Sequence, residues 1–160
     1  MPIHSVKKLV IRELGQQNYQ ECWQSMKLFT HNREALQTDE LWIVEHPPVF
    51  TLGVAGKREH LLNTSHNIPV IKSDRGGQIT YHGPGQLILY PLLNIQQHKL
   101  NIKQLVKKLE HLVMQTLSGY NITANTQPDA PGVYVNEKKI ASIGLRVRKG
   151  CSYHGISLNV

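Results

Sequence analysis

The chain has 160 residues, 40% of them hydrophobic, which is enough for one compact domain that needs no disulfide or metal to hold its core. Its formal net charge of +7 favours acidic partners, but its few aromatic residues are not interleaved with the basic ones, which argues against a nucleic-acid surface. No apolar run approaches membrane length, and Cys22 and Cys151 have no framework spacing, so we expect a cytoplasmic chain with reduced thiols, no disulfide and no membrane partner.

The first half of the chain predicts one helix among several short strands. Residues 9–11 have the composition of a strand, which Gly15 is expected to end. Within residues 17–32 the apolar positions repeat at helical spacing and predict a helix with Cys22 on its buried face. Residues 41–46 and 49–53 are further strand candidates, the first ended by Pro47 and Pro48, and residues 68–71 lead into the glycine-rich stretch. His60 and His66 have a spacing seen in zinc sites, but no cysteine pair accompanies them, so we expect solvated side chains and no metal.

The stretch from Asp74 to Gln86 is the most unusual part of the sequence. It holds four of the twelve glycines, flanked by Arg75, Thr80, Tyr81 and His82. Residues 79–81 alternate as a strand does, a turn at 83–85 follows, and an apolar run at 87–93 is expected to return from that turn. Because glycines let a backbone come close to a ligand, this loop is interpreted as one wall of a binding site rather than as a plain hairpin tip.

The second half begins with the clearest helix, residues 101–117, for which Asn101 and Gln104 predict a capping box. The face that carries Lys103, Lys107, Lys108 and Glu110 is expected to be solvated. A turn at 129–132 leads into strands at 133–135, 139–148 and 151–160, the first two joined at 136–137. Strands outnumber helices without regular alternation, so the predicted fold class is α+β: a mixed, largely antiparallel sheet with packed helices.

Two further segments could contribute chemistry. Lys139 follows a hairpin and precedes the small residues of 142–144, so it is a candidate acid or base if its environment lowers its pKa; an ordinary surface lysine is the alternative. Cys151 and His154 suggest a nucleophile and base. Residues three apart on a strand point to opposite faces, however, so a structural thiol is favoured.

Residues 75–86 closely resemble the signature of the lipoyl/octanoyl transferases, and residues 42–50, 129–134 and 138–159 resemble further parts of that family. The resemblance implies the fold of the lipoate and biotin protein ligase catalytic domains, and a single catalytic domain over residues 1–160. It implies that octanoyl moves from octanoyl-acyl carrier protein to a lysine of lipoyl domains through a cysteine thioester, in lipoate biosynthesis. Because the donor is already a thioester, no cofactor is expected.

The resemblance also implies roles for particular residues. Lys139 takes the place of the lysine that lowers the pKa of the nucleophilic cysteine. The acyl-binding positions fall on Arg75, Gly76, Gly77, Gln78, Ile79, Thr80, Tyr81, His82, Ser142, Ile143, Gly144, Gly155, Ile156 and Ser157.

One departure from the family pattern concerns the nucleophile. The Pro-Cys-Gly segment that carries it in the family falls beyond Val160, and Cys151 matches a cysteine that is not catalytic there. We therefore expect a C-terminally incomplete domain and no transfer by the 160-residue chain. Expected partners are octanoyl-acyl carrier protein, the lipoyl domains of 2-oxoacid dehydrogenases and the glycine cleavage H protein. The alternatives are an ATP-dependent lipoate-protein ligase and a non-catalytic module that binds acyl groups or their carrier.

Overall fold

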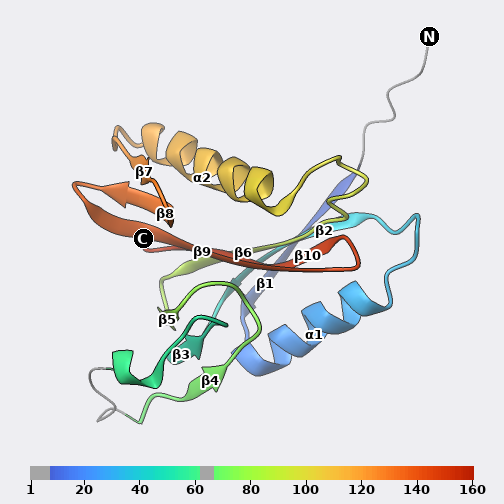
Figure 1. Cartoon of the computed structure of the whole chain (residues 1–160), viewed down its shortest axis with the longest axis horizontal. Coiled ribbons are helices and arrows are strands. Elements are labelled where there is room, and N and C mark those ends of the chain that lie inside the picture. Colours follow the sequence, from blue (N-terminus) through green and yellow to red (C-terminus); the bar gives the residue numbers. More distant parts are fainter. Residues whose placement is uncertain (1–7, 62–66) are drawn as a thin grey trace.

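The computed structural model describes residues 8–61 and 67–160, which form two helices, one single-turn 3-10 helix and ten strands (Figure 1). The helices are α1 (Tyr19–His31) and α2 (Ile102–Ser118), and the 3-10 turn spans Arg58–His60. The strands are β1 (Leu9–Gln16), β2 (Asp39–Glu45), β3 (Val49–Leu52), β4 (Val70–Lys72), β5 (Ile79–His82), β6 (Leu87–Leu92), β7 (Asn125–Gln127), β8 (Ala130–Val135), β9 (Lys138–Arg148) and β10 (Cys151–Leu158).

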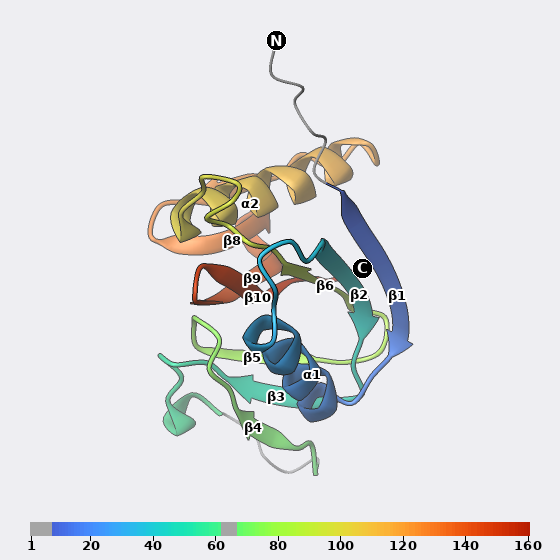
Figure 2. The same ribbon diagram turned by 90° about the vertical axis from the view of Figure 1, so that its right-hand side faces the viewer.

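The strands form two sheets. The larger one has seven strands in the order β1-β2-β6-β10-β9-β8-β7, and the smaller has three in the order β4-β3-β5. Only the pairs β1–β2 and β3–β4 run parallel among the described strands. The expectation of an α+β fold with a mixed, largely antiparallel sheet is therefore confirmed. Figures 1 and 2 show α2 on one face of the large sheet, with α1 and the small sheet on the other.

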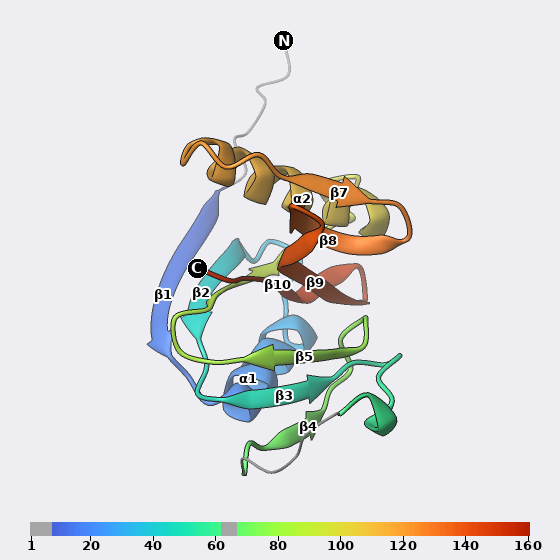
Figure 3. The same cartoon turned by 90° about the vertical axis from the view of Figure 1, so that its left-hand side faces the viewer.

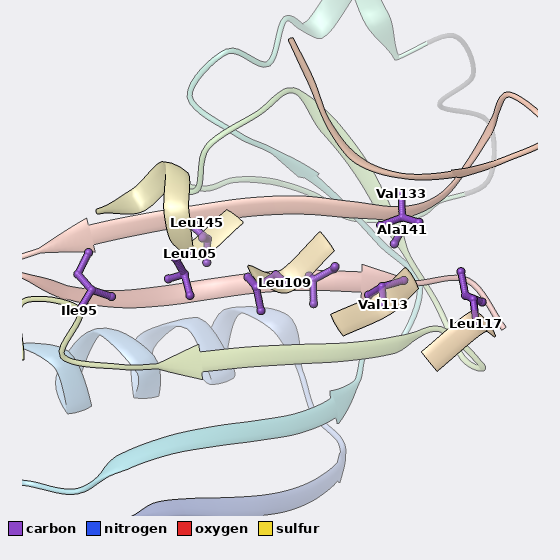
Figure 4. Packing of buried hydrophobic residues seen from close by; sticks show 9 residues of the cluster. Ile95, Leu105, Leu109, Val113, Leu117, Val133, Ala141 and Leu145 are labelled. Atoms are coloured by element: carbon purple, nitrogen blue, oxygen red, sulfur yellow. The ribbon is translucent and has the colours of Figure 1, made fainter. Parts of the chain in front are cut away.

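One hydrophobic core lies between α2 and the large sheet. Leu105, Leu109, Val113 and Leu117 recur every four residues on α2, which puts them on one face of the helix. They pack against side chains of β8, β9 and β10, among them Val133, Ala141 and Leu145 (Figure 4). The predicted capping box is present: Asn101 and Gln104 each accept a hydrogen bond from the other's backbone N–H, so the helix begins where the sequence predicts.

A second core lies on the opposite face, beneath α1. Cys22 and Met26 of α1 pack on Val44, Ile88 and Tyr90 of the large sheet. Residues of β6 alternate between the two cores, because Ile88, Tyr90 and Leu92 face α1 whereas Leu89 packs on the α2 side. This double burial explains why residues 87–93 form a continuous apolar run. The interpretation of Cys22 as a core residue is confirmed.

The expected return of residues 87–93 from the turn after residues 79–81 is wrong. β5 pairs with β3 in the small sheet, whereas β6 lies between β2 and β10 in the large one. Because both edges of β6 are already occupied, β5 cannot pair with it, and the Gly83–Gly85 turn carries the chain from one sheet to the other (Figure 3). The turn predicted at 129–132 also shifts: the chain turns at Pro128 and Asp129, and Ala130 already belongs to β8.

Candidate active site

Two neighbouring hollows lie near the junction of the two sheets. The first is an open cleft of about 670 Å³ lined by the loop before β5, the start of α2, the start of β8 and part of β9. The second is a cavity of about 30 Å³ lined by α1, β5, β6, β9 and β10. They lie side by side, because they share five lining residues: Arg75, Thr80, Ser142, Ile143 and Gly144.

Arg75 holds the glycine-rich loop in place. Its side chain is buried and donates hydrogen bonds to Thr51 and to the carbonyl oxygens of Gly76 and Gln78 at 2.7–2.9 Å. Burial lowers its pKa from the ordinary value. Because most of its hydrogen-bonding capacity goes to the loop and to β3, Arg75 shapes the wall of the cleft as well as lining it.

Asp74 fastens the same loop to the large sheet and to α1. Its carboxylate accepts hydrogen bonds from Trp23 Nε1 (2.8 Å), Tyr153 OH (2.5 Å) and, at 2.8 Å, His154 Nε2. Burial acts to raise the pKa of Asp74, but the three donors outweigh it and the pKa falls well below its usual range. One carboxylate thus connects α1, the loop and β10 behind the site.

Gly144 and Gly155 each lie so close to a neighbouring backbone carbonyl that no side chain would fit there. A Cβ on Gly144 would lie 2.6 Å from the carbonyl oxygen of Gly76, and one on Gly155 would lie 2.0 Å from that of Leu89. The sequence suggested that small residues at 142–144 make room for a ligand. The structure shows that Gly144 makes room for the Arg75–Gly77 loop, which itself forms the cleft.

Lys139 reaches the cleft because β9 carries a bulge. Tyr134 lies opposite Lys139 and Val133 lies opposite Ala141, which leaves Ile140 as an extra residue. In an unbroken strand Lys139 would share a face with Ala141, which is buried under α2. A bulge shifts this alternation, and Lys139 is instead exposed and lines the cleft.

The backbone of β8 supports the Lys139 side chain. Nζ donates to the carbonyl oxygen of Pro131 (3.2 Å) and lies 5.3 Å from the ring centroid of Tyr134. The methylene groups of Lys139 lie against Gly132, where a Cβ would come within 3.1 Å of Cε.

Glu110 is not solvated, contrary to the expectation for its face of α2. Its side chain is buried and Oε1 accepts a hydrogen bond from the backbone N–H of Gly132 (3.0 Å). Glu110 follows Leu109, so on the helix it lies at the edge of the buried stripe. At this edge its carboxylate reaches the backbone of β8.

The inner end of the cavity is an aromatic cluster. Tyr19 of α1 stacks on His82 with 5.9 Å between ring centroids, and its edge meets His46 at 5.2 Å. Burial lowers the pKa of His82 to about 4 and raises that of Tyr19 to about 12. Burial lowers the pKa of His46 as well, so these three side chains are neutral near pH 7.

Comparison with known proteins identifies the family. Residues 18–160 match the lipoyl protein ligase A/B catalytic domain. The chain belongs to this family. It is 57% identical to an octanoyltransferase of Shewanella sediminis over 156 residues, which are 98% of the chain and 71% of that protein. It is 56% identical to an octanoyltransferase of Shewanella putrefaciens over all 160 residues, 72% of that protein. The resemblance drawn from residues 75–86 is confirmed.

Solved structures of distant relatives share the fold of this lipoyl protein ligase A/B domain. A lipoate-protein ligase A bound with ATP matches with a TM-score of 0.72 at 14% identity, covering 96% of the chain and 66% of that protein. A bipartite lipoate protein ligase from Thermoplasma acidophilum gives 0.65 at 15% identity, covering 96% and 61%. A biotin acetyl coenzyme A carboxylase synthetase from Helicobacter pylori with bound biotinylated ATP gives 0.60 at 15% identity, covering 96% of the chain and 62% of that protein. The likeness to lipoate and biotin ligase catalytic domains is thus a likeness of fold.

The expected site residues of this family member lie together with one exception. Lys139 lines the cleft with the six residues of segment 75–80 and three of β9, whereas four others line only the cavity. Tyr81 differs: it is 43% exposed, and its ring packs on Phe50, on the opposite side of β5 from Thr80 and His82. Residues that line the cleft are Arg75, Gly76, Gly77, Gln78, Ile79, Thr80, Lys139, Ser142, Ile143 and Gly144; the cavity adds His82, Gly155, Ile156 and Ser157.

Neither cysteine of the chain lies at the cleft. Cys22 belongs to the core under α1, where burial raises its pKa to about 12. Cys151 is 5% exposed, its Sγ is 3.7 Å from the carbonyl oxygen of Lys149, and burial raises its pKa too. His154 bonds to Asp74, so it does not activate Cys151.

Sequence reasoning missed Asp74, Trp23 and Tyr19. A carboxylate directly before the Arg-Gly-Gly run was the available signal for Asp74. No local pattern distinguishes Tyr19 from an ordinary core residue of α1. In the described ranges, 8–61 and 67–160, no three His, Cys, Asp or Glu side chains gather as metal ligands would, and no helix has the length and apolarity needed to span a membrane.

Proposed function

We propose that this chain is the acyl-binding catalytic domain of an octanoyltransferase, which moves octanoyl from a carrier-protein thioester to a lysine of a lipoyl domain. The observation that carries the proposal is the meeting of Lys139 with residues of two of the three predicted acyl-binding segments on one cleft: residues 75–80 of segment 75–82, and segment 142–144. The octanoyltransferases at 56–57% identity support the reaction class. The distant ligase structures, at 14–15% identity, speak for the ATP-dependent alternative only through the fold.

The reaction divides between this cleft and a cysteine thiolate. The thiolate attacks the octanoyl thioester, the carrier thiol leaves, and a lysine amine of the acceptor then forms the amide and releases the thiolate. In the proposal the acyl chain lies along the loop and β9, where Ser142, Ile143 and Thr80 contact it. The Lys139 ammonium stands at the open side, where it stabilises the thiolate. Cys22 and Cys151 are buried away from this point, so we assign the nucleophile to neither.

The donor is proposed to be octanoyl-acyl carrier protein, because acyl carrier proteins are acidic and this chain is basic. Lys103 and Lys107 are exposed on α2 and line a further hollow, which shares Ile102, Val106, Asp129 and Pro131 with the cleft. In the proposal these two lysines attract the acidic carrier to the entrance of the cleft. The proposed acceptors are the lipoyl domains of 2-oxoacid dehydrogenases and the glycine cleavage H protein. The ligase from T. acidophilum, described together with an E2 lipoyl domain, belongs to the same fold.

The test incubates the 160-residue chain with octanoyl-acyl carrier protein and a lipoyl domain, and follows binding by calorimetry and intact masses by mass spectrometry. We expect binding of the octanoyl carrier, weakened by Lys103→Glu, and no octanoyl adduct on the chain or the lipoyl domain. Absence of binding would contradict the proposal. A stable octanoyl adduct that Cys151→Ser abolishes would assign the nucleophile to Cys151. Transfer of free octanoate that requires ATP would establish the ligase alternative.

A further inference from the structure

Every residue that lines the cavity and not the cleft is buried. The cavity shares Arg75, Thr80 and the 142–144 segment with the cleft, and Lys139 lines only the cleft. An acyl chain that enters the cleft beside Lys139 therefore passes the shared residues before it reaches the cavity. That the ligand is an acyl group rests on the proposed function. The order of the lining residues, from Lys139 through the shared residues to the cavity, comes from the structure alone.

Tyr19 stands at the inner end, among side chains unique to the cavity. It is 3% exposed, and its hydroxyl shares a 2.7 Å hydrogen bond with Ser73 Oγ. Its ring is held between His82, stacked at 5.9 Å, and His46, edge-on at 5.2 Å.

His46 is itself fixed from both ring nitrogens. Nε2 is 2.8 Å from Tyr90 OH, and Nδ1 is 2.6 Å from the carbonyl oxygen of Gln17. An interior this densely bonded cannot yield to a longer ligand without breaking several contacts at once. The inner wall is therefore rigid as well as buried.

The chemistry of this wall suits the end of an alkyl chain. The rings of Tyr19, His82 and His46 are uncharged near neutral pH, because burial disfavours their charged forms. Ile88 and Ile156 add apolar surface to the lining, which also includes Arg75 and His154. His46 contacts the rings of Tyr19 and His82 without lining the cavity itself. A methyl end placed here displaces no counter-ion from these rings and covers apolar atoms.

The size of the cavity limits what can enter. A volume of about 30 Å³ admits roughly two water-sized groups, which corresponds to the last one or two carbons of a chain. Further carbons would meet the ring of Tyr19.

We propose that Tyr19 is the specificity-determining residue that sets the length of the acyl chain, by closing the cavity against the end of the chain. Removal of its ring opens the inner end towards Ser73 and His46, both of which are already buried. Longer chains then bury additional methylene groups, each of which is expected to improve affinity about fourfold.

The test titrates the 160-residue chain with non-hydrolysable acyl-pantetheine analogues of eight, ten and twelve carbons. In the unaltered chain we expect the eight-carbon analogue to bind most tightly. In Tyr19→Ala the optimum should move to ten or twelve carbons, with a gain of about fourfold per methylene that fits. Tyr19→Leu, which keeps the site apolar and is the milder change for folding, should move the optimum in the same direction. Tyr19→Phe keeps the ring and should keep the eight-carbon preference.

Leu117→Ala is the matched control, because it removes a buried side chain of the α2 core that lines neither the cavity nor the cleft. It should lower stability and leave the preferred length unchanged. If Tyr19→Ala and Tyr19→Leu are folded and still prefer eight carbons, the role of Tyr19 is disproved while the acyl site stands. If the unaltered chain binds no analogue of any length, the proposed function itself fails, and the role of Tyr19 fails with it.

Discussion

At the scale of single residues, the site depends on a carboxylate that does not itself line the cleft. Asp74 precedes Arg75 and accepts from three side chains on two other elements, while Arg75 bonds back to β3 and its own loop. The two adjacent residues thus fix the loop from opposite sides. Correct placement of residues 76–80 is a consequence of these contacts rather than of glycine flexibility alone.

Asp74→Asn tests this anchoring. The amide is neutral and replaces one carboxylate oxygen by a donor group, so the contacts from Trp23, Tyr153 and His154 lose the charge that strengthens them. We expect the free energy of unfolding to fall by about 2 kcal/mol, measured by urea denaturation at pH 7. Asp129→Asn is the control, because Asp129 is exposed at a turn with φ of +58°, which asparagine tolerates. Equal stability of the Asp74→Asn and Asp129→Asn variants would contradict the role of Asp74 as an anchor of the loop.

At the scale of elements, α2 contributes more than a cover for the sheet. Through Glu110 it fixes Gly132 of β8, and β8 in turn supports Lys139 through the carbonyl oxygen of Pro131. The bulge on β9 then directs Lys139 towards the cleft. Helix, strand and bulge together place a lysine that no one of them could position.

Removal of the Glu110 carboxylate should destabilise β8. Glu110→Ala leaves the N–H of Gly132 without its buried acceptor, which we expect to cost about 2 kcal/mol of the free energy of unfolding in urea. Glu110→Gln retains an oxygen acceptor and should recover at least half of that loss. Lys108→Ala, an exposed position on the same helix, should change stability by less than about 0.5 kcal/mol. A Glu110→Ala variant as stable as Lys108→Ala would show that the contact has no energetic role.

At the scale of the whole molecule, three buried histidines with lowered pKa values make the fold sensitive to acid: His46, His82 and His154. The pKa of His82 falls to about 4 in the folded state, against about 6.5 in an unfolded chain. Between these values the unfolded chain binds more protons than the folded one, so the free energy of unfolding falls as the pH falls. The pKa values of His46 and His154 shift in the same direction.

We expect stability to be full above about pH 6.5 and to decline towards pH 4, with about 3 kcal/mol lost through His82 alone. Urea denaturation at a series of pH values measures this decline. His82→Phe keeps an aromatic ring on Tyr19 but cannot titrate, so its stability should depend less steeply on pH. If the free energy of unfolding falls equally with pH in the unaltered chain and in His82→Phe, groups other than His82 cause the decline.

Much of the fold could be read from local patterns. The stripe on α2 and its capping box, the buried apolar run of β6 and the hairpin at 136–137 were all predicted, because each depends on neighbours along the chain. The failures involved contacts between distant segments. β5 was assigned to the wrong partner, and Glu110 was expected in solvent, because neither edge occupancy nor a backbone donor on β8 is visible along the chain.

The sequence by itself determined the fold class, the family and the residues that would gather at the site, since the glycine-rich stretch and the Lys139 segment are specific in their order of residue types. Only the tertiary structure decided how these residues cooperate. It placed Tyr81 away from the cleft, assigned Gly144 to backbone packing, and made Asp74 and Glu110 the supports of the loop and of β8. Supports of this kind join residues far apart in sequence, so their partners are set by packing, which no local pattern encodes.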